Sequence, residues 1–195
     1  FFLILMSIFL WGCPKKVEII PPEKPLFVNP IVKLLETFSS AESLQARTLI
    51  RIDTVRSGEE MNFLLNGLLL YQKPDKLRLF GYHPLGMGLF DALYRNGEFL
   101  LLIPLQKRAY TGEVSQFEDL IEKVGEIRIA SERSEGTDIP NRIRIDIVEK
   151  ETRIELRLKG ISVNSTLPED AFQWIIPEGV EVRPIAKLLK GKKLK

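Results

Sequence analysis

The chain has 195 residues, of which 45% are hydrophobic and 28% are charged, and its formal net charge is +2. This ordinary globular balance predicts one domain that is large enough to bury a core without disulfide staples. The small net charge, and the lack of stretches that mix aromatic and basic residues, exclude a strongly basic nucleic-acid-binding protein.

The first twelve residues form an uncharged, mostly apolar run that ends at Cys13, the only cysteine of the chain. A bilayer-spanning helix needs about 20 apolar residues, so we interpret residues 1–12 as the apolar part of a signal peptide. The run has no basic segment and does not begin with Met, and we therefore expect its true start to lie upstream.

The run ends in Leu10-Trp11-Gly12-Cys13, which resembles the lipobox of bacterial lipoproteins. The resemblance implies cleavage before Cys13 and attachment of the lipid anchor to its thiol. A lone cysteine in an exported protein has no disulfide partner and needs another role. The alternative is a buried free thiol behind an ordinary N-terminal helix.

Residues 13–30 follow as a proline-rich linker, with prolines at positions 14, 21, 22, 25 and 30. Proline blocks both helix and central strand, so this segment is predicted to be a semi-rigid spacer. The alternative is that part of it packs as an edge strand.

The first helix is expected over residues 30–45, with Asn29 as its N-cap and Pro30 in its first turn. Its apolar residues recur at helical spacing. A second, short helix is expected over residues 115–124.

Alternating apolar and polar residues predict strands in most of the remaining chain. Asn96-Gly97 is a strong hairpin signal between two of them. The pattern indicates a mostly β (α+β) fold of about 8–11 antiparallel strands in meander order. The expected strands cover residues 46–56, 61–72, 77–82, 88–95, 98–104, 107–111, 126–133, 142–149, 152–160 and 172–176.

Two stretches, residues 63–70 and 99–103, are apolar on both sides of the strand. Such excess apolar surface fits a ligand cavity, and it fits equally well a central strand that is covered on both faces.

The sequence offers few candidate catalytic or metal-binding residues, because His83 is the only histidine. There is no Gly-x-Ser-x-Gly elbow, no set of Cys and His ligands and no phosphate-binding glycine loop. We therefore predict a protein that is not an enzyme and that needs no metal and no cofactor.

The loop of residues 83–90 combines two glycines with apolar side chains. We expect Leu85, Met87 and Leu89 to lie at the mouth of a cavity, where they contact acyl chains or the bilayer. The alternative is a tight corner tucked into the core.

Several motifs follow one another along the chain: Tyr71-Gln72-Lys73-Pro74-Asp75-Lys76-Leu77-Arg78, His83-Pro84-Leu85-Gly86, Leu102-Ile103-Pro104 with Tyr110-Thr111-Gly112, Leu167-Pro168-Glu169-Asp170-Ala171-Phe172 and Pro177-Glu178-Gly179-Val180. In this order they resemble the lipoprotein-localisation family of the periplasmic carrier LolA and the outer-membrane receptor LolB. The resemblance covers residues 31–183. Leu44-Gln45-Ala46-Arg47 stands where LolA carries an aromatic-x-Gln signature, and a lipid anchor fits LolB better, because LolA is soluble.

The resemblance implies an incomplete β-barrel, or half-barrel, over residues 31–185, with helices covering its concave face and a basic tail at residues 186–195. Acyl chains would bind in the apolar cavity between sheet and helices. The residues expected to line it are Ile50, Ile52, Leu65, Leu69, Leu79, Leu101, Ile103, Ile145, Leu156 and Leu158.

The function expected on this basis is binding of acyl chains of lipoproteins or other lipids, and a LolB-like reception or insertion of lipoproteins. The partners would be the membrane, through lipidated Cys13, and a soluble carrier protein. Pro14 is not the Asp that retains lipoproteins at the inner membrane, which favours the periplasmic face of the outer membrane. The alternative is a non-catalytic structural or stress-sensing envelope lipoprotein of the same fold.

Overall fold

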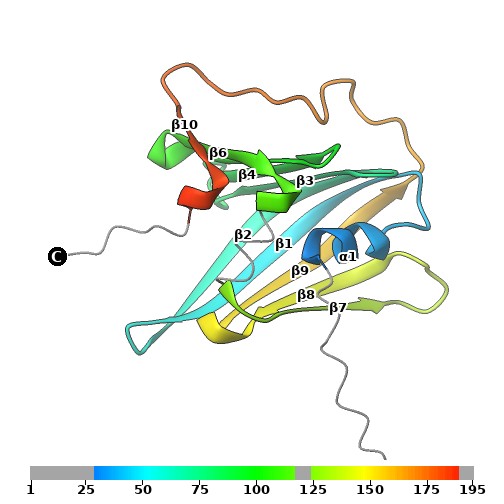
Figure 1. Ribbon diagram of the computed structural model, residues 1–195. Coiled ribbons are helices and arrows are strands. Elements are labelled where there is room, and N and C mark those ends of the chain that lie inside the picture. The colour runs from blue at the N-terminus through cyan, green and yellow to red at the C-terminus, as the bar shows by residue number, and fades with distance from the viewer. Residues whose placement is uncertain (1–28, 117–123, 189–195) are drawn as a thin grey trace, which may run out of the picture.

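The computed structural model describes residues 29–116 and 124–188 (Figure 1). Cys13, the signal peptide, the linker up to residue 28 and residues 189–195 of the basic tail lie outside the described residues. Residues 117–123 of the second helix, predicted over residues 115–124, also lie outside the described residues. Residues 114–116 and Val124, on either side of this gap, are helical.

One ten-stranded sheet dominates the fold, in the order β10-β6-β5-β4-β3-β2-β1-β9-β8-β7. All neighbouring strands are antiparallel except β10, which runs parallel to β6. Strands β10 and β7 are its two edges, so the sheet is an open half-barrel, as predicted (Figure 1). The strands are β1 (Ser43–Arg56), β2 (Glu59–Gln72), β3 (Lys76–Tyr82), β4 (Gly88–Arg95), β5 (Glu98–Ile103), β6 (Arg108–Glu113), β7 (Ile127–Arg133), β8 (Pro140–Ile147), β9 (Thr152–Val163) and β10 (Glu181–Pro184).

Two antiparallel meanders, β1–β6 and β7–β9, make up this sheet. They join where β9 pairs with β1, for example Leu156 opposite Ile50. The chain must therefore pass from β6, near one edge, to β7 at the other edge before the second meander begins. Three short 3-10 helices complete the described elements: η1 (Pro104–Gln106), η2 (Val148–Lys150) and η3 (Ile185–Lys187).

Helix α1 (Pro30–Thr37) lies inside the curve of the sheet (Figure 1). Asn29 caps it as predicted, because its side-chain oxygen accepts a hydrogen bond from the Ile31 amide at 2.9 Å. The predicted extension to residue 45 is wrong: the helix ends at Thr37 and β1 begins at Ser43. Residues 43–45 belong to β1 instead, because they pair with β2; Leu44, for example, is opposite Tyr71.

The α1 side of the sheet, here called the concave face, carries the main core. Phe38, just after the helix, is fully buried, and its ring centroid lies 5.6 Å from that of Tyr71. The rest of this core cluster comes from both meanders, which the pairing of β1 with β9 brings together.

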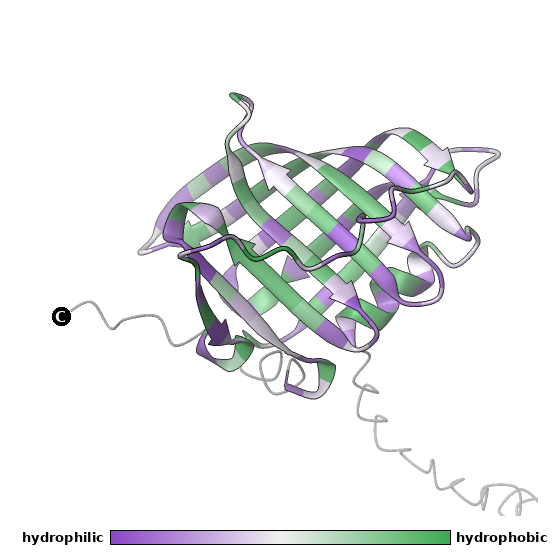
Figure 2. Cartoon of the chain, turned by 90° about the horizontal axis from the view of Figure 1, so that it is seen from above, coloured by the Kyte–Doolittle hydropathy of each residue, from purple (hydrophilic) through white to green (hydrophobic). Residues whose placement is uncertain are grey.

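The opposite, convex face is covered over β2–β6 by residues 164–180, here called the strap (Figure 2). Leu70, Leu100 and Leu102 pack against Ala171 and Phe172 of the strap. Coverage of both faces, one of the two alternatives left open by the sequence, therefore explains the double apolarity of residues 99–103 and of the end of the 63–70 stretch. It does not explain the start of that stretch, because Leu64 is 55% exposed on the convex face.

The predicted strand at residues 172–176 is wrong, because the strap pairs with no strand. Side chains replace the missing ladder: Arg78 donates to the carbonyl oxygen of Ala171 at 2.8 Å, and Arg95 donates to that of Phe172 at 2.9 Å. The last strand is instead β10, which begins at Glu181, after the strap, and is parallel to β6. Within the ranges described, no helix has the length and apolar character that crossing a bilayer requires.

Candidate functional site

All ten residues expected to line the cavity lie on the concave face. The strand register shows this directly, since Ile50 is opposite both Leu65 on β2 and Leu156 on β9. The same register places Leu79 opposite Leu69, and Ile145 opposite Ile154. One face of the sheet thus carries an unbroken set of aliphatic side chains from β5 to β8.

These ten side chains divide into two groups by burial. Five are buried in the core cluster together with Phe38, namely Ile50, Leu65, Leu69, Leu156 and Leu158. The other five, Ile52, Leu79, Leu101, Ile103 and Ile145, are only half-buried. The first group holds the fold together, and the second group retains surface that an apolar ligand can contact.

A second, smaller cluster closes the concave face near the β6 edge. Tyr110 and Ile185 are buried there, and Leu101 and Ile103 pack against them. The half-buried lining residues Leu101 and Ile103 of β5 therefore adjoin this smaller cluster.

The loop between β3 and β4 presents its apolar side chains to solvent. Leu85 is 88% exposed and Met87 is 49% exposed. The backbone is nonetheless ordered by hydrogen bonds, from the His83 amide to the Met87 carbonyl at 2.8 Å and from the Gly86 amide to the His83 carbonyl at 2.7 Å. The alternative of a corner tucked into the core does not hold for these two residues, whereas Leu89 is half-buried and packs on the core cluster.

A third exposed apolar side chain at this end of the sheet was not anticipated from the sequence. Leu105 in η1 is 61% exposed, and η1 packs against β4, which starts at the end of the 83–87 loop. Pro104 before it and Lys107 after it mark a turn, but a turn does not reveal which other loop it will adjoin.

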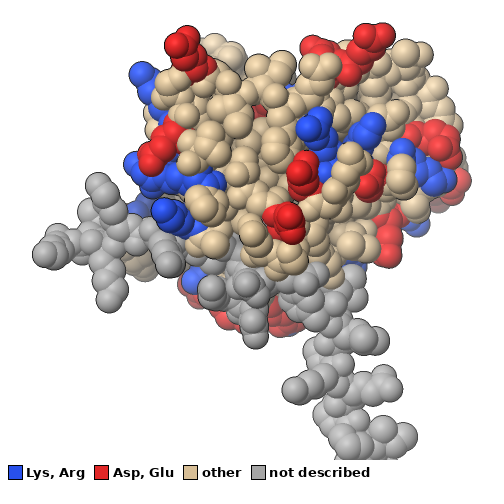
Figure 3. All heavy atoms as spheres, turned by 45° about the horizontal axis from the view of Figure 1, so that its top comes forward, with Lys and Arg blue, Asp and Glu red and all other residues tan. Residues whose placement is uncertain are grey.

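The flank formed by β6, β10 and η3 also gathers Lys and Arg side chains (Figure 3).

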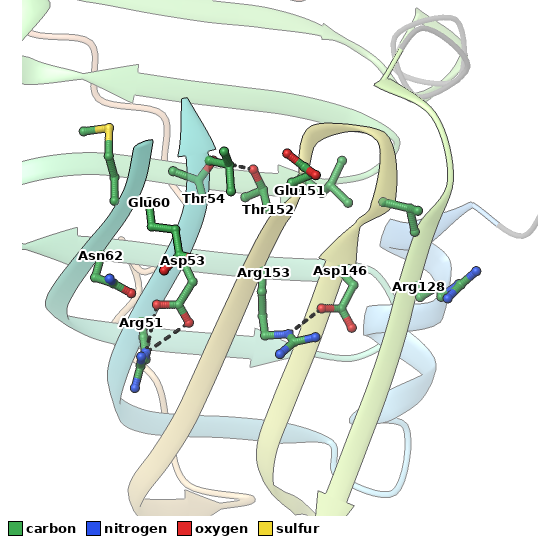
Figure 4. A pocket seen from close by; sticks show the side chains of 14 residues that line it. Arg51, Asp53, Thr54, Glu60, Asn62, Arg128, Asp146, Glu151, Thr152 and Arg153 are labelled. Atoms are coloured by element: carbon green, nitrogen blue, oxygen red, sulfur yellow. Dashed lines mark hydrogen bonds and ion pairs between the residues drawn. The ribbon is translucent and has the colours of Figure 1, made fainter. Parts of the chain in front are cut away.

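A polar hollow of about 540 Å³ lies between the β1–β2 and β8–β9 hairpins (Figure 4). Its charged groups are largely paired. Arg51 Nε lies 3.0 Å from the Asp53 carboxylate, and Arg153 Nε lies 2.7 Å from that of Asp146. The hydroxyls of Thr54 and Thr152 are hydrogen-bonded to each other at 2.7 Å. Two ion pairs therefore lie inside the hollow, and the carboxylates of Glu60 and Glu151 line it as well.

The charges continue as rows across the convex side of β1, β9 and β8. Glu155 accepts a hydrogen bond from Arg157 at 2.5 Å, and Arg142 Nε lies 3.7 Å from Oε1 of Glu155. The hydrogen bond from Arg157, together with the charges of Arg157, Arg142 and Arg144, holds the pKa of the Glu155 carboxyl below its usual value. This network therefore links charged side chains of β8 and β9 on the convex side. Among the residues described, no three side chains of His, Cys, Asp or Glu are arranged to hold a metal ion.

No protein-family model matches the chain, and no curated protein matches it. Solved structures are similar to it at low identity. A LolA superfamily protein from Nitrosomonas europaea has 10% identity and a TM-score of 0.45, over 73% of this chain and 96% of that one. A conserved protein from Thermus thermophilus has 14% identity and a TM-score of 0.44, over 80% and 97% of the two chains.

A further similar structure is described as an outer membrane lipoprotein-sorting protein domain from Vibrio parahaemolyticus. It has 13% identity and a TM-score of 0.38, over 74% of this chain and 95% of that one. The lipoprotein-localisation family expected from the sequence is thus among those whose solved structures this chain resembles, whereas the closeness to LolB stays a prediction.

Proposed function

We propose that this chain is a non-catalytic, lipid-anchored envelope protein that binds acyl chains on the concave face of its half-barrel. The observation that carries the proposal is the placement of all ten predicted lining residues on that face, five of them only half-buried. Burial of each chain methylene against such a surface contributes about 0.8 kcal/mol, so even a short contact with an acyl chain is favourable.

The finer proposal is a LolB-like role, in which the protein receives lipoproteins from a soluble carrier and inserts them at the periplasmic face of the outer membrane. The lipobox at Cys13 and the residue Pro14 after it support the location. Among the similar structures are a LolA superfamily protein and an outer membrane lipoprotein-sorting domain, and the sequence motifs resemble the same family.

The exposed loop residues Leu85 and Met87 are proposed to contact the bilayer or the departing acyl chain. An apolar side chain that is 88% exposed on a hydrogen-bonded turn is available for contact without any rearrangement of the core. Leu89 packs inward, so we assign it to the support of this loop.

The test is native mass spectrometry of the full chain carrying Cys13→Ser, with a palmitoylated peptide as the probe. We expect one bound peptide, and binding about tenfold weaker in Leu79→Gln and in Leu101→Gln, since each places an amide among the half-buried aliphatic residues. Leu64→Gln is the matched control, because Leu64 is 55% exposed on the convex face.

Far-UV circular dichroism and the thermal midpoint show whether each variant is folded. Equal weakening in Leu64→Gln would place the binding outside the concave face. Absence of any bound acyl chain in the folded parent would instead favour the alternative, a structural or stress-sensing envelope lipoprotein of the same fold.

A further inference from the structure

Four cations lie at the corner of the sheet where β6 pairs with β10; they come from the turn between η1 and β6, from the start of β6, from β10 and from η3. Lys107 ends the η1 turn, and its carbonyl accepts a hydrogen bond from the Glu181 amide at 2.9 Å. Arg108 is opposite Glu181 in the parallel β6–β10 pair. The remaining two cations follow on β10 and η3, and we call Lys107, Arg108, Arg183 and Lys187 the basic corner.

The carboxylate of Glu181 lies among these cations. Glu181 Oε2 lies 2.7 Å from Arg183 Nη2 and 3.9 Å from Arg108 Nε. The hydrogen bond from Arg183, together with the charges of Arg183, Arg108 and Lys187, holds the pKa of Glu181 below its usual value, so this carboxylate is ionised at neutral pH. The five groups together keep a surplus of positive charge, while the whole chain has a formal net charge of only +2.

Exposed apolar side chains adjoin the basic corner. Leu105 lies in η1, two residues before Lys107, and Leu85 and Met87 lie in the neighbouring loop. The closeness of the two turns is shown at Gly88, where a Cβ atom would lie 4.0 Å from Cγ of Pro104. One rim of the molecule therefore combines cations with aliphatic tips.

The combination of cations with exposed aliphatic side chains indicates which class of anionic partner the surface suits. Cations that are interspersed with protruding aliphatic side chains suit a bilayer interface, where phosphates lie next to hydrocarbon. Nucleic acid would instead favour aromatic side chains between the cations, and none is exposed at this corner.

We propose that the basic corner docks the domain on anionic phospholipid, with Leu105 entering the interface beside the 83–87 loop. The cations lie against the lipid phosphates and orient the rim towards the bilayer. The inference goes beyond acyl-chain binding, because it requires only the outer surface of β6, β10 and the two turns.

The first test compares partitioning of the full chain carrying Cys13→Ser into vesicles of phosphatidylcholine with partitioning into equal parts phosphatidylcholine and phosphatidylglycerol. The ratio of the two partition coefficients cancels any contribution of the apolar N-terminal run. We expect Lys107→Gln with Lys187→Gln to lower this ratio roughly 25-fold, because each cation near an anionic surface contributes about fivefold. Both lysines are exposed, so the fold should not change.

The control is Lys33→Gln with Lys159→Gln, which removes the same charge from exposed positions on α1 and on the convex side of β9. The control should leave the ratio unchanged. Equal losses in the two double variants would mean that net charge alone acts, and this would overturn the proposal, as would an equal affinity of the parent for the two kinds of vesicle.

Hydrogen exchange supplies the local readout. In the lipidated full chain, amides of residues 105–108 and 181–187 should exchange more slowly in the phosphatidylglycerol vesicles than in phosphatidylcholine alone. Amides that are equally protected in both vesicles would contradict docking at this corner. Loss of acyl-chain binding with intact protection would contradict only the proposed function, so the two failures are distinguishable.

Discussion

Arg78 on β3 and Asp91 on β4 form a partly buried ion pair beneath the strap, with Arg78 Nη2 2.6 Å from Oδ2 of Asp91 and Arg78 Nε 2.9 Å from Oδ1. Hydrogen bonding to Asp91 is the main reason that the pKa of Arg78 is raised. The same guanidinium donates to the Ala171 carbonyl. One ion pair therefore connects two central strands with the segment that covers their convex face.

Asp91→Ala should lower the free energy of unfolding by about 3 kcal/mol, because it leaves the Arg78 charge partly buried and uncompensated. Urea unfolding followed by circular dichroism measures the loss. The double variant Arg78→Met with Asp91→Leu should recover part of it, since no lone charge remains while the Ala171 carbonyl still lacks its donor. A double variant that is less stable than Asp91→Ala would contradict this account.

Thr48→Val should stabilise the protein by about 1 kcal/mol. The Thr48 hydroxyl is buried on the concave face and has no hydrogen-bond partner among the described residues, so a methyl group of the same shape removes its desolvation cost. Gly67→Ala, directly opposite on β2, should have the reverse effect, since its Cβ would collide with the Thr48 side chain and lie 2.7 Å from the Phe80 carbonyl oxygen. Thermal unfolding should show a higher midpoint than the parent for Thr48→Val and a lower midpoint for Gly67→Ala.

Acid should weaken the fold partly through Glu155. Its pKa is lower in the folded state than the ordinary value of 4.5, so its contribution is fully present above that value and is lost as the pH falls through the folded pKa. The stability difference between the parent and Glu155→Gln should therefore shrink as the pH is lowered from 6 towards about 3. Arg157→Gln should flatten the same pH dependence, because the hydrogen bond from Arg157 is the main cause of the shift. A pH-independent difference would rule out this origin.

Leu85→Glu should impair the delivery of lipid to membranes without destabilising the fold. Leu85 is 88% exposed, so a charged side chain there costs the folded state little, whereas insertion of a carboxylate into a bilayer is strongly unfavourable. Transfer of an acylated peptide from the protein to vesicles is the assay, with the thermal midpoint as the check on folding. Leu64→Glu, exposed on the convex face, should transfer normally. Full activity of Leu85→Glu with normal lipid binding would count against the role of this loop.

Cys13→Ala should release the protein from the membrane fraction, because stable anchoring requires covalently attached lipid chains. It should leave acyl-chain binding intact, since every predicted lining residue lies within β1–β9. Membrane fractionation followed by native mass spectrometry of the released protein measures both properties. Loss of both together would show that the linker is part of the binding domain.

The sequence by itself determined the strands and their two faces. Period-two alternation is a local property, and it located β4 with its bounds and most other strands within a few residues. The same alternation assigned Ile50, Leu79 and Ile145 to one face, because a strand's side chains must alternate once its register is set. The N-cap at Asn29 was likewise local, since it depends on a side chain and an amide two residues apart.

Only the tertiary structure decided what covers each face and which ends of the chain meet. The predicted strand at residues 172–176 does not form, and the strap is held instead by side chains from distant strands. Arg78 is 93 residues from Ala171 and Arg95 is 77 residues from Phe172, and each donates a hydrogen bond to the carbonyl of its partner. The basic corner arises in the same way, because the parallel pairing of β10 with β6 brings Arg183 beside a turn far away in sequence. Local patterns state which residues are apolar or charged, whereas pairing between distant segments sets which of them are buried, exposed or gathered into one surface.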